Sequence, residues 1–409
     1  MVVTSQRQPT SADAREANRT YRRTRLPRPY PDPSAYQANL KAALESDPRK
    51  KANYERYLAA RKTATPDFLP IKLDIENISR CNFRCTMCQV SDWGPKFQRA
   101  EDMALEHFKH LIDEQYGLVE VKVQGMGEPL LQRETFFEMV RYARSKHIWV
   151  RTTTNASLLH FRDNYKSLIE ADPGEVQISF DGATKQTFEA IRRGSKFELV
   201  YDNCKLINSY CNDRGLLKTR MWALVQQGNI GEFPEFVDRA AEMGFRRLTY
   251  GLNLTDWGQA KWADANKAVT AEDDVTPEMA HAAMDKGKRL GVEVTFWDVT
   301  SKYSAESADK LCAWPFERAF VSSDMKVVPC CIIANPEVYN LGSAQDFNGV
   351  WQSKAYQRFR QAHLDGRIPK VCELCYIRPA GSGKPPHAPT DVGQDATSRP
   401  AKDPALDYE

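Results

Sequence analysis

Between residues 71 and 253 the chain alternates short apolar stretches with segments of helical periodicity. We predict β-strands near residues 71–78, 119–125, 148–154, 175–181, 220–227 and 246–253, with helices between them. Strands that recur in this way form a parallel sheet with right-handed crossovers. Six such units predict an α/β fold, a partial (β/α)6 TIM-like barrel. In barrels of this type the chemistry gathers at the carboxyl ends of the strands.

Three cysteines, Cys81, Cys85 and Cys88, directly follow the first predicted strand. Their C-x-x-x-C-x-x-C spacing places three thiolates on one short loop. Three thiolates can hold three corners of a cubane iron–sulfur cluster and leave the fourth iron open to another ligand. A zinc knuckle would need a fourth protein ligand, and no further cysteine or histidine lies nearby in the sequence. We therefore expect the open iron to be the reaction centre.

With the apolar Met87 before its last cysteine, this motif resembles the signature of radical S-adenosylmethionine (radical SAM) enzymes. In that family the open iron chelates SAM, and one electron cleaves SAM to a 5′-deoxyadenosyl radical. The resemblance covers roughly residues 70–300. It implies a SAM-binding [4Fe-4S] cluster on the three cysteines, S-adenosyl-L-methionine as a cofactor, and a flavodoxin- or ferredoxin-type reductant.

Further segments at successive strand ends resemble motifs of the same family. The second strand ends in a G-x-G-E-P segment, where two glycines let a ligand approach the backbone closely. The fourth strand ends in an S-x-D-G-A segment, followed by an arginine. The residues that the resemblance implies in SAM binding are Met87, Gly125, Met126, Gly127, Glu128, Asn155, Ser179, Arg192, Leu224 and Gln226. The alternative for the fourth strand is a turn at Asp181-Gly182, a capped helix, and Arg192 at the surface.

Five of the ten cysteines lie in residues 310–376, after a predicted helix (277–290) and a short strand (292–296). Their arrangement resembles the SPASM/twitch extension of radical SAM enzymes, and no cysteine follows Cys375. We therefore predict a small twitch-type domain with one auxiliary [4Fe-4S] cluster. The predicted ligands are Cys312, Cys330, Cys372 and Cys375. Cys331 is a spare thiol or an alternative ligand, and a zinc ribbon with the same ligands is the competing interpretation.

Composition and charge limit the remaining possibilities. The formal net charge of +3 implies no nucleic-acid partner, and no apolar stretch is long enough to cross a membrane or act as a signal peptide. We expect a cytoplasmic protein. The predicted organisation is a disordered tail (1–35), N-terminal helices (36–69), the barrel (70–300), the auxiliary cluster domain (301–379) and a second disordered tail (380–409).

Together the motifs predict a radical SAM oxidoreductase, dehydrogenase-like or bond-forming. Because no peptide-recognition domain precedes the barrel, we expect a small polar substrate first, a sugar, aminocyclitol or other natural product. A peptide- or protein-modifying maturase is the second hypothesis. A non-catalytic iron–sulfur or zinc protein is the third. Candidate substrate residues follow the last barrel strand, where ordinary turn residues are the alternative; they are Asn253, Asp256 and Trp257.

Overall fold

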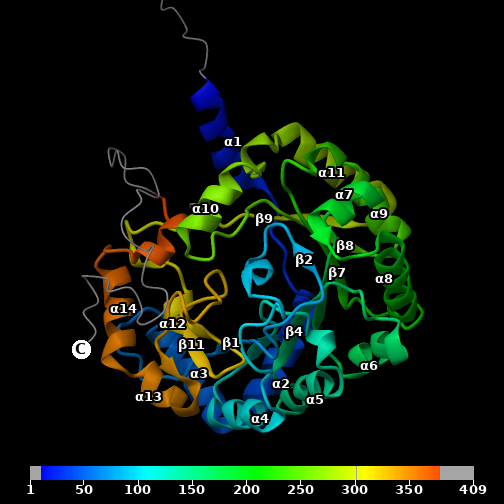
Figure 1. The fold of residues 1–409 in the computed structure, drawn as a ribbon. Coiled ribbons are helices and arrows are strands. Elements are labelled where there is room, and N and C mark those ends of the chain that lie inside the picture. The colour runs from blue at the N-terminus through cyan, green and yellow to red at the C-terminus, as the bar shows by residue number, and fades with distance from the viewer. Residues whose placement is uncertain (1–10, 301, 378–409) are drawn as a thin grey trace, which may run out of the picture.

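The computed structural model describes residues 11–300 and 302–377, and these form a curved sheet with helices on its outer side (Figure 1). The sheet has ten strands in the order β12-β11-β10-β1-β3-β4-β5-β7-β8-β9. Its strands are β1 (Lys72–Ile75), β3 (Glu120–Val123), β4 (Trp149–Thr154), β5 (Glu175–Ser179), β7 (Thr219–Leu224), β8 (Arg247–Gly251), β9 (Glu293–Trp297), β10 (Arg318–Val321), β11 (Lys326–Val328) and β12 (Gly342–Ser343). A separate two-stranded sheet pairs β2 (Arg84–Cys85) with β6 (Arg192–Arg193).

The barrel portion runs from β1 to β9, and all its neighbouring strands are parallel. The six predicted strands correspond to β1, β3, β4, β5, β7 and β8. The short strand predicted at residues 292–296 is β9, which adds a seventh parallel strand. The α/β fold with a mostly parallel barrel-like sheet is therefore confirmed.

Helices cover the outer side of the barrel because alternate strand residues are apolar. Leu73 and Ile75 of β1 and Val121 and Val123 of β3 belong to one buried core with the helices. The residues between them, such as Asp74, face the barrel interior. The barrel helices are α4 (Leu105–Glu114), α5 (Glu134–Ser145), α6 (Asn164–Glu170), α7 (Lys185–Ile191), α8 (Phe197–Asn212), α9 (Glu235–Glu242), α10 (Ala260–Lys267) and α11 (Pro277–Leu290).

The C-terminal region continues the barrel sheet. Strand β10 pairs in parallel with β1, and β11 and β12 follow as antiparallel strands. Its helices are α12 (Trp314–Glu317), α13 (Phe347–Trp351) and α14 (Lys354–Leu364). The indole of Trp351 donates a hydrogen bond to the Phe68 carbonyl at 2.8 Å, which ties this region to the segment before β1. The two cysteine-rich regions therefore share one sheet.

The N-terminal segment differs from the predicted disordered tail. Residues 11–25 form α1 (Ser11–Arg25), which lies beside α11 (Figure 1), while residues 1–10 lie outside the described residues. Arg19 pairs with Asp273 at 2.7 Å, and the buried Arg22 pairs with Asp273 at 3.1 Å and Asp298 at 3.4 Å. Composition alone misses these ion pairs, because their acidic partners are far away in the sequence.

Some of the remaining predicted segments lie within the described residues and others lie outside them. Helices α2 (Pro33–Ser46) and α3 (Pro48–Ala59) occupy the region where two helices are expected. The predicted tail at residues 380–409 lies outside the described residues. No helix in the described ranges has the length and apolar character required to cross a membrane.

Candidate active site at the open end of the barrel

The loop after β1 carries Cys81, Cys85 and Cys88 at the carboxyl end of the barrel strands. Cys85 lies in β2, which pairs with β6, and the Thr86 amide donates to the Ile191 carbonyl at 3.0 Å. Two strands of the small sheet thus fix the loop against the segment after α7. The loop position agrees with the sequence-based expectation that the cysteines follow the first barrel strand.

The three cysteines of this loop are partly buried. Burial raises the pKa of Cys81 to about 12, and Cys85 adds to this rise; burial also raises the pKa of Cys88, with further contributions from Cys85 and Cys81. Metal coordination would remove these protons, because iron binds the thiolate form. In the described part of the chain, no three His, Cys, Asp or Glu side chains converge enough to hold a single metal ion. A cubane instead takes one thiolate per iron, so the donor set fits an iron–sulfur cluster.

Glu128 links the ends of β3 and β4 beneath this loop. Its carboxylate accepts hydrogen bonds from the Thr154 hydroxyl at 2.6 Å and the Asn155 amide at 2.7 Å. Burial raises the pKa of Glu128 to about 6, and the bonds from Asn155 and Thr154 oppose that rise. The Asn155 side chain reaches Asn82 at 2.9 Å and lies 3.8 Å from the Cys81 sulfur. Glu128 and Asn155 therefore support the cysteine loop.

The two glycines of the G-x-G-E-P segment are required by packing within the protein. A Cβ at Gly125 would lie 2.1 Å from the Glu76 side chain, and one at Gly127 would lie 2.3 Å from the Arg80 carbonyl oxygen. The Met126 amide, between them, donates to the Glu76 carboxylate at 3.0 Å. The loop after β1 thus lies close to both glycines, and their contact with a bound ligand stays a prediction.

Arg192 lies in the interior and pairs with Asp181 at 2.7 Å, so the alternative that placed it at the surface is wrong. Asp181 also accepts a hydrogen bond from the Leu224 amide at 2.8 Å, which links the ends of β5 and β7. The Arg192 charge is close enough to lower the pKa of Cys85 against the effect of burial. Its Nε has no hydrogen-bond partner among the described residues. Arg192 is thus a buried cation beside the cysteine loop with donor capacity left.

The other predicted SAM-binding residues lie around the same end of the barrel. Ser179 is the last residue of β5 and pairs in register with Trp222. Met87 packs against Ile191 in a small apolar cluster that also includes Leu224. The buried Gln226 leaves its Nε2 without a partner in the described part of the chain. A bound cofactor could accept a hydrogen bond from this buried amide, which would otherwise lack a partner.

The C-terminal cysteines form a second, partly buried group. Burial raises the pKa of Cys372, and the nearby thiols of Cys330, Cys312 and Cys375 raise it further. The hydroxyl of Tyr376 accepts a hydrogen bond from the Cys312 amide at 2.9 Å, which joins the two ends of this group. These four cysteines are the ones predicted from the sequence to hold the auxiliary cluster.

Cys331 faces a different environment from Cys330. After burial, the charges that most affect the pKa of Cys331 are those of Asp74 on β1, Lys122 on β3 and Arg318 on β10. For Cys330 they are the charges of Cys331, Cys375 and Cys312. The assignment of Cys330 as the fourth ligand, with Cys331 as a spare thiol or an alternative ligand, stays a prediction.

The loop after β8 lies between the two cysteine groups. The Trp257 indole donates to the Met87 carbonyl at 3.3 Å, and the Asp256 carboxylate accepts from the Gly258 amide at 2.9 Å. The Asp256 charge also raises the pKa of Cys372, although its effect is smaller than those of burial and of the other thiols. Asn253 instead bonds to Thr300 at 2.7 Å and serves the packing of the barrel rim.

Sequence reasoning did not identify Gln89, the residue after the last cysteine of the loop. Its side-chain oxygen accepts hydrogen bonds from Gln259 at 3.0 Å and Asn335 at 3.2 Å, and its amide donates to the Ile333 carbonyl at 3.4 Å. Gln89 therefore joins the first cysteine loop to the C-terminal region. Its position beside Cys88 was the only signal available in the sequence.

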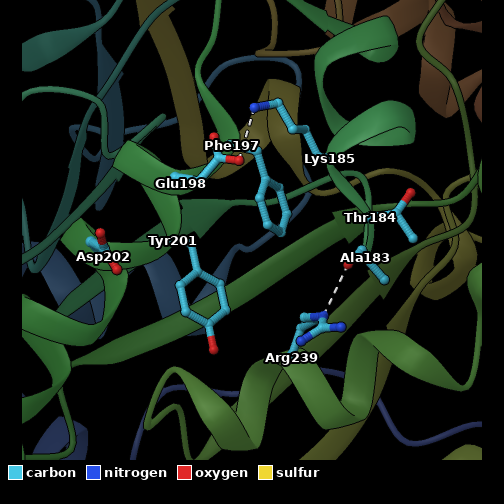
Figure 2. A pocket seen from close by; sticks show the side chains of 8 residues that line it. All are labelled: Ala183, Thr184, Lys185, Phe197, Glu198, Tyr201, Asp202 and Arg239. Atoms are coloured by element: carbon cyan, nitrogen blue, oxygen red, sulfur yellow. Dashed lines mark hydrogen bonds and ion pairs between the residues drawn. The ribbon is translucent and has the colours of Figure 1, made fainter.

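A surface pocket lies away from these groups, among the outer helices α7, α8 and α9 (Figure 2). Lys185 pairs with Glu198 at 2.8 Å across it, and Arg239 donates to the Ala183 carbonyl at 2.9 Å. Its lining includes no cysteine. The pocket is therefore separate from the candidate active site.

Comparisons with known proteins agree with this geometry. The radical SAM superfamily model matches residues 75–240, and the SPASM model, an iron–sulfur cluster-binding domain, matches residues 312–376. The mycofactocin maturase MftC of Mycolicibacterium smegmatis is 28% identical over 339 residues, 81% of this chain and 80% of that protein.

Solved structures share the fold. Streptococcus suis SuiB bound to its precursor peptide SuiA has a TM-score of 0.58 and 14% identity, covering 81% of this chain and 79% of SuiB. The structure of anSMEcpe with bound AdoMet and the Cp18Cys peptide has a TM-score of 0.52 and 19% identity, covering 75% of this chain and 88% of that one.

Proposed function

Since the chain belongs to the radical SAM superfamily and carries a SPASM iron–sulfur domain, we propose that it is a maturase that modifies a peptide or protein substrate. The similarity to a curated maturase over 80% of that protein supports this substrate class. The sequence alone favoured a small polar substrate. The comparisons favour the peptide alternative instead.

The cofactors are SAM, a [4Fe-4S] cluster in the radical SAM domain and auxiliary iron–sulfur in the SPASM domain. When bound, SAM and its cluster supply a radical that can remove hydrogen from an unactivated C–H bond. The observation that carries the proposal is the convergence of the Cys81 loop, Asn155 and Arg192 at the strand ends.

We assign separate roles to the residues at this end of the barrel. Cys81, Cys85 and Cys88 hold the first cluster. Arg192, paired with Asp181, offers its remaining donor to the SAM carboxylate, because a guanidinium can contact two anionic groups at once. The other residues predicted from the sequence to bind SAM remain proposed contacts of this cofactor.

Glu128 acts indirectly in this proposal. Its carboxylate is occupied by Thr154 and Asn155, so it holds the ends of β3 and β4 and thereby the amide of Asn155 near the Cys81 sulfur. The SPASM cysteines lie across the Trp257 loop from the first cluster. This arrangement suits transfer of an electron from a substrate radical, and we propose a net oxidation with a flavodoxin- or ferredoxin-type reductant.

The test is anaerobic reconstitution followed by incubation with SAM and dithionite. Formation of 5′-deoxyadenosine is expected from the wild type and not from Cys88→Ala. Candidate peptides encoded beside the gene are then added, and mass spectrometry follows the loss of hydrogen from the peptide. Cleavage of SAM without change in any peptide, but with turnover of a sugar or aminocyclitol, would restore the small-substrate hypothesis.

A further inference from the structure

The interior face of the barrel carries charged side chains, and most of them are paired. Lys72 contacts Glu120 at 3.2 Å, and Arg318 contacts Glu317 at 2.7 Å. Glu175 is shared by three arginines at distances of 3.1–3.2 Å, which are Arg151, Arg220 and Arg247. Pairing of this kind is expected, because an isolated charge inside a protein is strongly destabilising.

Asp74 and Lys122 are exceptions to this pattern. They are opposite each other in the register of β1 and β3, yet among the described residues neither side chain has a hydrogen bond, or an ion pair within 4.0 Å. Asp74 is buried and Lys122 is partly buried. Their apolar neighbours on both strands face the outer core, so these two side chains face the barrel interior.

The charges around this pair have both signs. Lys122, Arg318 and Arg151 favour the ionised form of Asp74, and Glu120 opposes it. Arg318 and Arg151 already contact carboxylates of their own, Glu317 and Glu175. Asp74 is the carboxylate that acts most strongly on Lys122. Among the described residues, the Lys122 amine is therefore the cation of this group that can take a further negative group beside Asp74.

The pair also lies between the two cysteine groups. Lys122 lies three residues before Gly125, where the G-x-G-E-P segment begins, and that segment packs against the first cysteine loop. The Cys331 thiol, next to the auxiliary ligand Cys330, is close enough for Asp74 and Lys122 to affect it. A substrate group bound to Lys122 would therefore bring the neighbouring part of the substrate close to both cysteine groups.

We propose that Lys122 binds a carboxylate of the peptide substrate, and that Asp74 accepts a hydrogen bond from an N–H group next to that carboxylate. This inference rests on the proposed peptide-modifying function and names the chemical group that the barrel recognises. The carboxylate belongs either to the C-terminus of the peptide or to an acidic side chain. In both cases Lys122 and Asp74 position the substrate and take no part in bond breaking.

The test measures binding of three N-acetylated tripeptides to the reconstituted, SAM-loaded protein by calorimetry. The first is trialanine with a free C-terminal carboxylate, the second is its C-terminal amide, and the third is the amide with a central glutamate. We expect one carboxylate-bearing peptide to bind about tenfold or more tightly than the neutral amide, since a charge-assisted hydrogen bond contributes on this scale. Whichever peptide is preferred identifies the source of the carboxylate.

Two variants separate this role from a structural one. Lys122→Met should abolish the preference, and its folding is checked by circular dichroism. The control Lys72→Met should keep the preference and melt lower, because it leaves Glu120 without this partner. Equal binding of all three peptides, no binding by the wild type, or a preference retained by Lys122→Met would overturn the proposal.

The same samples distinguish failure of this inference from failure of the proposed function. Formation of 5′-deoxyadenosine from SAM is measured in each preparation. Wild-type protein that cleaves SAM but does not prefer a carboxylate contradicts the assignment of Lys122 alone. Wild-type protein that contains both clusters and does not cleave SAM contradicts the proposed function.

Discussion

The indole nitrogen of Trp257 donates a hydrogen bond to the carbonyl oxygen of Met87 at 3.3 Å. Met87 lies between two cysteines of the first loop, and Trp257 lies on the loop that also carries Asp256, next to the C-terminal cysteines. The next residue, Gly258, packs against Ile333 and Val338 of the C-terminal region. One short loop therefore contacts both cysteine groups and fixes their relative position.

We predict that Trp257→Phe weakens the coupling between the two sites. The ring volume is largely kept, but the hydrogen bond to Met87 is lost, which should lower the stability by about 1 kcal/mol. We expect the variant to form 5′-deoxyadenosine while product per 5′-deoxyadenosine falls several-fold. The ratio of the two is measured by chromatography. Trp222→Phe, on the interior of β7, is the matched control, because it makes the same substitution at a site that does not join the two cysteine groups. An unchanged ratio in Trp257→Phe would show that Trp257 does not couple the two sites.

The iron content distinguishes a second cluster from a zinc ribbon. Anaerobic reconstitution is expected to give about eight iron atoms per chain, as two cubanes require. The triple variant Cys81→Ala, Cys85→Ala, Cys88→Ala should retain about half of this iron and lose SAM cleavage. Metal analysis gives both values. About four iron atoms with zinc in the wild type would establish a zinc ribbon at the C-terminal group.

The barrel could be predicted from the sequence because its strands are apolar on alternate residues or throughout, and its helices have their own period. The junction with the C-terminal region could not be predicted, because the pairing of β1 with β10 joins segments that are far apart in the chain. Helix α1 was missed for a similar reason, since Arg22 is paired by residues of another segment.

In the candidate site too, local patterns could be predicted from the sequence, and contacts between distant segments could not. The cysteine motifs are local patterns, so the loop of Cys81 and the pair Cys372 and Cys375 were evident at once. Whether Cys330 or Cys331 is directed toward the other cysteines depends on how the chain turns after β11, which spacing does not reveal. The partners of Gly125 and Gly127 are likewise set by packing against Glu76 and Arg80.

A buried histidine on α14 should make the stability of the C-terminal region depend on pH. Burial lowers the pKa of His363 from 6.5 to about 4, while its bond to the Phe359 carbonyl opposes the shift. Between these values the unfolded chain binds a proton that the folded protein does not, so stability falls as pH decreases. The loss amounts to at most about 3 kcal/mol.

Thermal melting of the wild type and His363→Leu between pH 7.5 and 5 measures this effect. We expect the melting temperature of the wild type to fall more steeply with decreasing pH than that of His363→Leu. Surface-exposed His107→Leu is the control and should follow the wild type. Parallel curves for the wild type and His363→Leu would show that His363 does not titrate as its burial requires.

The last prediction concerns the role of the C-terminal cysteines. Cys372→Ala combined with Cys375→Ala should leave the first cysteine group able to assemble, because its ligands lie on the loop after β1 and are held by β2, β6 and Glu128. Formation of 5′-deoxyadenosine should therefore survive, while the oxidised product is lost. Folding is checked by circular dichroism, and Cys204→Ala serves as the control because Cys204 is buried on α8, outside both cysteine groups. If the double variant makes product at the wild-type rate, the auxiliary cluster is structural, and the reaction is a redox-neutral rearrangement or epimerisation instead of an oxidation.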